Sequence, residues 1–208
     1  LYLDKNEWVG TRDHRGILAD SRYFAHDTRS LDGDNQVWEV NQAIEWVNKL
    51  QFASPFFIEE PTSPDDVIGH KTIKNGVFPI KVATGEMCQN RIIFKQFIKE
   101  DAVDIIQIDS CRMGGLNEVL AVMIMAEKYK KPVWPHAGGV GLCEYVQHIS
   151  MIDYLLISCE KNSKRIEYVD HLHEHFLHPC KIMNGNYMAP FDPGFSIEMK
   201  SSTLNDYL

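Results

Sequence analysis

Two glutamates follow strand-like runs at similar places in the sequence. Glu59 lies in FFIEEP and Glu86 ends PIKVATGE. On neighbouring strands about 4.8 Å apart, two carboxylates can bind one hard cation. Mg²⁺ is the expected ion because it prefers carboxylate oxygens and leaves positions open for substrate. A third ligand is expected from Asp32 or Asp34 in LDGDN. Taken alone, Glu59 fits equally well a solvated loop residue or a partner of a lysine.

Asp109 and His136 end the next two strand-like runs, DIIQID and PVWPH. A carboxylate that accepts a hydrogen bond from one imidazole nitrogen orients the ring and raises its basicity. This pair is therefore a candidate acid/base dyad. Three glycines follow at 138, 139 and 141, where free backbone amides at a helix start could bind a substrate anion. A tight turn explains these glycines equally well.

A competing pattern lies at HLHEH, where His171, Glu174 and His175 match H-x-x-E-H, the inverted zinc-peptidase motif. On one helix face these side chains could hold Zn²⁺. The chain has nine histidines, so a five-residue match arises easily by chance. A polar helix that closes the fold, with His178 following it, is the simpler interpretation.

These residues belong to a regular alternation of two periodicities. Strand-like runs bounded by turn residues lie at 56–61, 79–86, 104–109, 132–136 and 153–158. Helical spacing of apolar residues separates them, as in 43–50 and 116–126. Strands that alternate with helices predict a parallel sheet with crossovers, which is an α/β architecture.

The polar strand ends favour a barrel over an open doubly wound sheet. Their numbers run from 59 to 86 to 109 to 136, which gives separations of 27, 23 and 27 residues. One functional group per βα unit is typical of a (β/α)₈ enzyme, whereas a doubly wound sheet concentrates its site at one switch point. A full barrel takes about 250 residues. We therefore predict a partial TIM-type barrel over residues 32–176.

The two ends of the chain differ from this pattern. Residues 1–31 show no clear period and stay unassigned, and residues 177–208 are rich in Pro, Gly and Asn, which predicts a closing segment. The opening LYLDKNEW begins with Leu and has neither a basic nor an apolar leader region. We expect a fragment of a longer protein.

Composition narrows the function classes. There are 21 Lys plus Arg against 29 Asp plus Glu, for a net charge of −8, which argues against nucleic acid and anionic membranes as partners. The longest apolar run has eight residues, 119–126, too few to span a bilayer. Five cysteines at least 16 residues apart indicate a reduced, intracellular protein. Neither G-x-S-x-G nor a P-loop occurs, so small molecules and cations remain as ligands.

Five longer segments together resemble a known family. They are IEEPTSPDD, VATGEMCQNR, QIDSCRMGGLNE, WPHAGGVGLCEYVQH and IEYVDHLHEHF. From about Asn35 to the C-terminus the chain resembles the enolase superfamily, in its mandelate-racemase subgroup, and within it the L-fuconate dehydratases. The resemblance implies the C-terminal barrel domain of that superfamily, without its N-terminal capping domain.

The resemblance also implies roles for individual residues. Mg²⁺ would be held at Glu59 and Glu86, Asp109 and His136 would be the acid/base dyad, and Glu167 would lie near the substrate carboxylate. The implied reaction is that of a hydro-lyase in carbohydrate acid catabolism. It removes the proton α to a carboxylate, stabilises the enediolate on Mg²⁺ and expels the β-hydroxyl, converting L-fuconate to 2-keto-3-deoxy-L-fuconate and water. A mitochondrial location is implied as well.

Two departures from the family pattern leave an alternative open. The family's first metal ligand is an Asp at the position of Gly33, which Asp32 and Asp34 flank, and its Lys-x-Lys pair has no counterpart in residues 1–31. The alternative is a catalytically inert fragment with a binding or regulatory role. The sequence leaves a homo-oligomer open.

Overall fold

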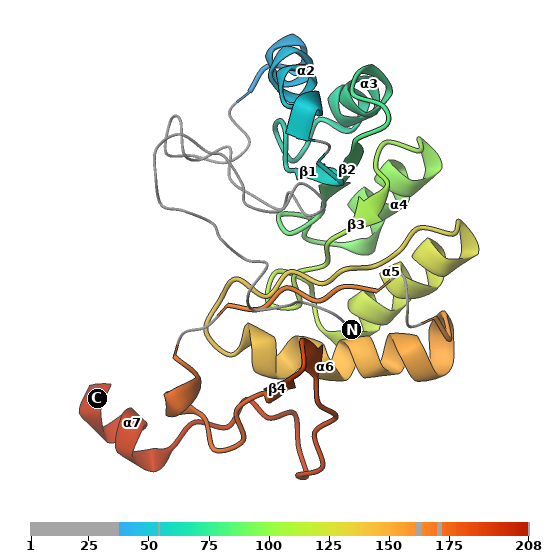
Figure 1. The fold of residues 1–208 in the computed structure, drawn as a ribbon. Helices are drawn as coiled ribbons and strands as arrows, with labels where there is room; N and C mark the ends of the chain where they lie inside the picture. Colours follow the sequence, from blue (N-terminus) through green and yellow to red (C-terminus); the bar gives the residue numbers. More distant parts are fainter. Residues whose placement is uncertain (1–37, 54, 161–163, 170–171, 208) are drawn as a thin grey trace.

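The computed structural model describes residues 38–53, 55–160, 164–169 and 172–207 (Figure 1). Its helical elements are α2 (Val40–Lys49), η1 (Gln51–Ala53), α3 (Val67–Gly76), α4 (Arg91–Lys99), α5 (Leu116–Lys128), α6 (Leu142–Ile152), η2 (Asp153–Ile157), η3 (His173–His175) and α7 (Ser201–Tyr207). Its strands are β1 (Phe57–Glu59), β2 (Lys81–Thr84), β3 (Ile105–Ile106), β4 (Ile182–Met183) and β5 (Asn186–Tyr187). No described helix is long and apolar enough to cross a membrane.

The first three strands form a parallel sheet in the order β1-β2-β3. Glu59 pairs with Ala83, and a parallel bridge from Ile106 to Val133 adds the segment 132–136 to the edge. The predicted α/β architecture and its parallel strands are therefore confirmed. Within the described residues these strands form an open sheet and not a closed barrel.

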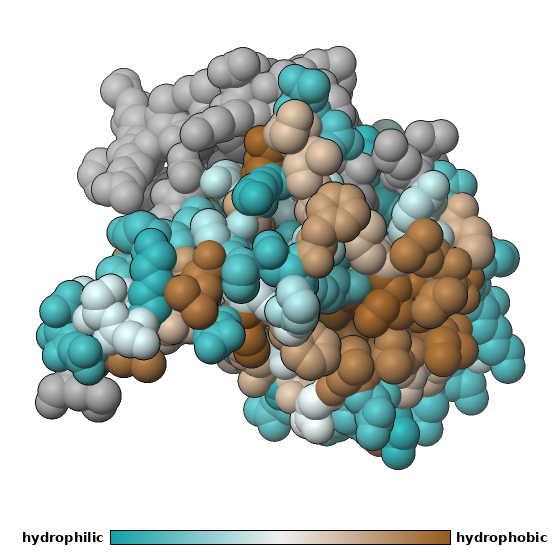
Figure 2. All heavy atoms as spheres, turned by 90° about the horizontal axis from the view of Figure 1, so that it is seen from below, coloured by the Kyte–Doolittle hydropathy of each residue, from teal (hydrophilic) through white to brown (hydrophobic). Residues whose placement is uncertain are grey.

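The strand predicted at 153–158 is wrong. This segment continues α6 as the π-helical element η2. A short apolar run fits a strand and a helix equally well, so its pattern did not discriminate. Asp153 is buried and pairs with Lys164 at 2.6 Å, while Leu155 and Leu156 stay exposed. Figure 2, which views the molecule from below, shows apolar side chains gathered on part of its lower surface.

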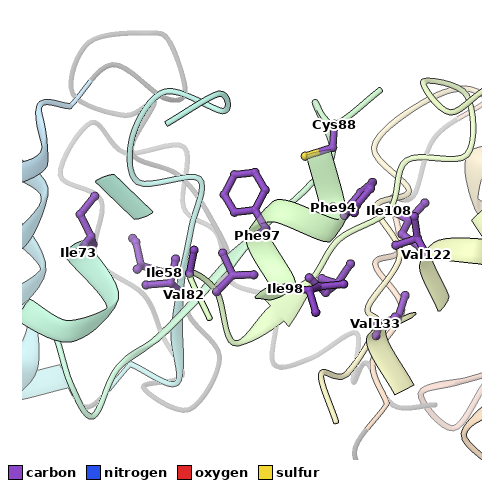
Figure 3. Close-up of a cluster of buried hydrophobic side chains, with 14 of the residues drawn as sticks. Ile58, Ile73, Val82, Cys88, Phe94, Phe97, Ile98, Ile108, Val122 and Val133 are labelled. Atoms are coloured by element: carbon purple, nitrogen blue, oxygen red, sulfur yellow. The ribbon is translucent and has the colours of Figure 1, made fainter. Parts of the chain in front are cut away.

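The helices α2 to α5 cover one side of the sheet (Figure 1). Side-chain caps fix where two of them begin. Asp66, just before α3, accepts from the Gly69 N–H, and Asn90, just before α4, accepts from the N–H groups of Ile92 and Ile93. Apolar side chains of these helices pack on the strands and form the main core (Figure 3), which includes Ile58, Ile73, Val82, Phe94, Phe97, Ile98, Ile108, Val122 and Val133.

The opposite side of the sheet is also apolar near its centre. Phe57, Ala83, Ile105 and Trp134 form a separate buried cluster, each from a different strand segment. The rings of Phe57 and Trp134 meet edge to face with centroids 5.6 Å apart. The strands are thus buried on both faces, as parallel strands generally are.

The C-terminal part of the chain packs against α6. The hairpin β4–β5 turns through Asn184 and Gly185, both with positive φ, which is the geometry that Asn-Gly favours in two-residue hairpins. Tyr187 of β5 is buried in a second apolar cluster with Val146 and Ile166. Its hydroxyl donates to the Glu167 carbonyl at 2.6 Å, so the hairpin supports the segment that carries Glu167.

Truncation of Phe97 tests whether the helix-facing core holds the sheet together. Phe97 is buried on α4, and we expect Phe97→Ala to lower the free energy of unfolding by about 3–5 kcal/mol, because it leaves a cavity. Urea denaturation measures the loss. The matched control, Ile92→Ala, removes an exposed side chain of the same helix and should change stability by less than about 0.5 kcal/mol. Equal losses in both variants would contradict this description of the core.

Candidate active site

The polar residues singled out from the sequence lie on the side of the sheet opposite the helices, the side that carries Phe57 and Trp134. Side chains alternate along a strand, so Glu59 follows Phe57 on the same face, and His136 likewise follows Trp134. Asp109 lies four residues after Ile105 and shares its face. Parallel hydrogen bonding continues to these positions, since the His136 N–H donates to the Ile108 carbonyl at 3.0 Å. The sheet therefore brings these groups to one edge.

Asp109 and His136 form the predicted dyad. His136 Nδ1 lies 2.9 Å from Asp109 Oδ2, and Asp109 Oδ1 accepts the backbone N–H groups of Cys111 and Arg112 at 2.7 and 3.2 Å. Burial alone would raise the pKa of Asp109. The hydrogen bonds from His136 and Cys111 outweigh it and hold the pKa below its usual range. Asp109 is therefore a carboxylate that fixes the orientation of the ring.

The other ring nitrogen of His136 faces two more carboxylates. Nε2 lies 3.1 Å from Glu86 Oε2 and 3.8 Å from Glu167 Oε2. Burial opposes the charged ring, but the hydrogen bond with Asp109 and the charges of Glu167 and Glu86 raise the pKa of His136 to about 9. In this arrangement His136 is an imidazolium at neutral pH, with a proton on Nε2 directed at the carboxylates.

Glu59 and Glu86 lie at the ends of adjacent strands, as predicted. Glu59 Oε1 accepts from Gln107 Nε2 at 2.5 Å, and Glu86 Oε1 lies 3.6 Å from Arg112 Nη1. Burial, and next the charge of Glu167, raise the pKa of Glu59 to about 8, against the effect of the Gln107 hydrogen bond. Several carboxylates thus repel one another around this edge of the sheet.

The donor set suits a hard divalent cation, because carboxylate oxygens are the ligands that Mg²⁺ prefers and a cation would offset their repulsion. Glu59 and Glu86 are the described residues that could bind it. Their oxygens, with those of Glu167, do not form a group of three within 4.8 Å in the described part of the chain. The predicted third ligands, Asp32 and Asp34, lie outside the described residues.

A hydrogen bond from a backbone amide holds the side chain of Glu167 beside the dyad. Its Oε2 accepts the Ala137 N–H at 2.6 Å, so this amide binds a protein carboxylate. The Gly139 N–H donates to the Ala137 carbonyl, and Gly141 precedes α6 with φ of +75°, which supports the tight-turn interpretation. A Cβ on Gly138 would lie 2.7 Å from His136 Nε2, so glycine leaves room for the ring.

The H-x-x-E-H pattern does not form a helix face in the described residues. Its first histidine, His171, lies outside them, and 173–175 is a single 3₁₀ turn. Glu174 is exposed, and His175 Nδ1 lies 3.2 Å from Thr203 Oγ1. The geometry gives no support to a zinc peptidase.

The sequence did not single out two contributors to this site, Gln107 and Arg112, and it did not indicate that Gly138 lies against the His136 ring. Gln107 lies two residues before Asp109, so the alternation of the strand would have placed it on the same face. Arg112 follows in the next turn and contacts both Glu86 and Asp109. Nothing in the local sequence marks Gly138 as the residue that approaches His136.

The chain is similar in sequence to a known family and to individual proteins. Residues 30–203 match the family described as Enolase C-terminal domain-like. The chain is 56% identical over 198 residues to L-galactonate dehydratase of Hypocrea jecorina, covering 94% of this chain and 44% of that protein. It is 52% identical over 175 residues to human mitochondrial enolase superfamily member 1, covering 83% of this chain and 40% of that protein. The chain therefore spans less than half the length of these relatives.

Solved structures show the same fold. The crystal structure of human mitochondrial enolase superfamily member 1 aligns with a TM-score of 0.80 and 53% identity, over 82% of this chain and 39% of that chain. L-Talarate dehydratase from Polaromonas sp. JS666, complexed with Mg and L-glucarate, aligns with a TM-score of 0.70 and 23% identity, over 82% and 44%. At 23% identity, the similarity to L-talarate dehydratase is one of fold alone.

The close approach of Gly138 to His136 yields a test of the site geometry. Gly138→Ala should displace the His136 ring and lower the free energy of unfolding by about 1–3 kcal/mol, because the new methyl overlaps the ring. NMR of the imidazole ¹⁵N and Nδ1 proton signals reports the ring position. Gly114→Ala is the control, since its Cβ would lie 3.6 Å from Glu118 Cγ, an ordinary contact. Unchanged His136 signals in Gly138→Ala would rule out this packing.

Proposed function

Since this chain belongs to the Enolase C-terminal domain-like family, we propose that it provides the acid/base part of a Mg²⁺-dependent sugar-acid dehydratase. The observation that carries the proposal is the contact chain from Asp109 through His136 to Glu86 and Glu167. It combines a charged imidazole with carboxylates at one edge of a parallel sheet, where enzymes of this architecture build their sites.

His136 is suited to act as the general acid. Nδ1 is held by Asp109, so the proton on Nε2 is the one available to a ligand. Transfer of this proton to the departing β-hydroxyl of a sugar acid releases water and leaves a neutral imidazole that Asp109 keeps in the same tautomer. Glu167, 3.8 Å from Nε2, lies where it can orient a hydroxyl or carboxyl group of the ligand.

Glu59 and Glu86 are the proposed metal ligands, with Asp32 or Asp34 as the third. Bound there, Mg²⁺ would act as a Lewis acid for the substrate carboxylate, which makes the adjacent carbon more acidic. Gln107 and Arg112 hold the two glutamates at the strand ends through side-chain contacts. Their part is to position these carboxylates for a cation.

L-Fuconate is the proposed substrate, with L-galactonate as its nearest competitor. The two acids share the configuration around the reacting carbons and differ by the hydroxyl at C6, and one relative is named for L-galactonate. The reacting groups at His136 and Glu167 therefore do not discriminate between them. A mitochondrial location is proposed from the relatives that carry that word in their name.

The metal proposal predicts a Mg²⁺-dependent rise in thermal stability of the 208-residue chain. A ligand at 100 times its Kd stabilises the native state by about 2.7 kcal/mol. For a chain of this size each kcal/mol corresponds to about 2–4 °C in Tm. Differential scanning fluorimetry with and without Mg²⁺ measures the shift. Glu86→Gln should abolish it, because one ligand charge is removed.

The control for this melt is Glu45→Gln, which removes an exposed carboxylate paired with Lys49 on α2. It should keep the full Mg²⁺ shift. A cooperative melt that does not respond to Mg²⁺ would instead support the inert fragment with a binding or regulatory role.

The acid role of His136 is tested by His136→Asn. We expect dehydration of L-fuconate and L-galactonate, followed as release of the 2-keto-3-deoxy acid, to fall by about 10²- to 10⁴-fold. Mg²⁺ binding should persist, because both glutamates remain. His178→Asn, an exposed histidine paired with Asp192, is the control and should keep its activity. Unreduced turnover in His136→Asn would refute the assignment.

A further inference from the structure

A second cluster of ligand-type side chains lies outside the dyad. Glu144 in the first turn of α6, His173 in η3 and Cys180 bring one oxygen, one nitrogen and one sulfur atom within 4.8 Å of one another. No other group of three in the described residues does so. We propose that these three residues form a structural Zn²⁺ site that fastens the C-terminal segment to α6.

The distances within the cluster fit a tetrahedral ion. His173 Nδ1 lies 2.6 Å from Glu144 Oε1 and 3.9 Å from Cys180 Sγ. Zinc binds sulfur at about 2.3 Å and nitrogen or oxygen at about 2.0–2.2 Å, so its ligand atoms lie about 3.3–3.6 Å apart. The nitrogen and oxygen must separate by less than about 1 Å, and the sulfur must approach by less than that.

The outer contacts of His173 are those of a metal-binding histidine. Nε2 lies 2.8 Å from the Val169 carbonyl, which can only accept, so Nε2 carries a proton. Nδ1 donates to Glu144 Oε1 in the metal-free chain, and a bound cation would take the place of this proton. A backbone carbonyl that accepts the second ring N–H is the usual support of a metal-bound imidazole. The Tyr168 ring stacks on the imidazole at 5.4 Å and 11°, which fixes its plane.

Glu144 supplies an independent indication of a missing ligand. Its side chain is 1% exposed, and its buried Oε2 has no hydrogen-bond partner among the residues that the structure describes. Oε1 accepts the Cys180 N–H at 3.2 Å as well as facing His173. A buried carboxylate with an oxygen that no donor satisfies is costly, and a bound cation removes that cost.

Cys143 is the proposed fourth ligand. It precedes Glu144 on α6, is buried, and its Sγ accepts the Val169 N–H at 3.4 Å, next to the carbonyl that orients His173. Its Sγ is not within 4.8 Å of all three other ligand atoms, so it would have to approach them when the metal binds. A mixed set of two sulfurs, one nitrogen and one oxygen suits Zn²⁺ and not Mg²⁺, which requires oxygen ligands. The two metal sites would therefore select different ions.

The site would also support the catalytic edge of the sheet. Val169, whose carbonyl orients His173, lies two residues after Glu167 on the same segment. A metal that joins α6, η3 and Cys180 would hold that segment in place from one side, while Tyr187 holds it from the other. Loss of the zinc should therefore loosen the position of Glu167 without touching the dyad.

Cobalt substitution tests the site without any assay of activity. Co²⁺ added to the reduced 208-residue chain should give a thiolate-to-metal absorption band in the near ultraviolet, displaced by Zn²⁺ and unaffected by excess Mg²⁺. Cys180→Ser should lower the band and weaken Zn²⁺ binding at least tenfold. Cys159→Ser, an exposed cysteine outside the cluster, is the matched control and should match the unaltered chain.

A second variant keeps the test decisive if Cys180→Ser does not fold. Glu144→Gln keeps the size of the side chain and removes its charge, and it should also weaken Zn²⁺ binding at least tenfold. Absence of a thiolate band in the unaltered chain, or equal Zn²⁺ affinity in Glu144→Gln, would overturn the proposal. The Mg²⁺ melt reports on Glu59 and Glu86, which lie outside this cluster, so the two proposals can fail separately.

Discussion

The alternation of side chains along the parallel strands is the constraint on which the site depends. It assigns Ile58 and Val82 to the helices and leaves Phe57 on the other face, two residues before Glu59. The apolar cluster in the middle of that face excludes water, and the ionisable groups follow where the strands end. The low local dielectric and the small separation of His136 from its carboxylates both follow from this one repeat.

Much of this arrangement could be predicted from the sequence. Three of the five predicted strands occupy their expected segments, and a fourth, 132–136, joins the sheet through one bridge. Asp109 meets His136 because the two residues end neighbouring segments of the sheet. The prediction succeeded because the period of two is local and the order of parallel strands follows the chain. The barrel itself is not visible in the described strands, and the predicted ligands Asp32 and Asp34 fall outside them.

Other features depend on tertiary contacts that no local pattern encodes. The segment that begins at Asp153 is helical, and a buried ion pair with Lys164 compensates the charge of the Asp153 carboxylate. In the HLHEH segment the motif predicted a role for the outer residues, whereas the middle histidine, His173, forms a hydrogen bond with Glu144. That partner lies 29 residues earlier in the chain, so spacing within the motif gave no indication of it.

Charge balance connects the two proposed metal sites. At the sheet edge, His136 is the positive charge nearest to Glu86, and it is shared with Asp109 and Glu167. His136 and the more exposed Arg112 face three carboxylates here. The pKa of Glu59 is raised to about 8, first by burial and next by the charge of Glu167. A hard cation at the strand ends would supply the missing charge and leave the proton of His136 free for a ligand. At α6 the buried glutamate faces sulfur and nitrogen instead, so the same need for positive charge there favours a softer ion.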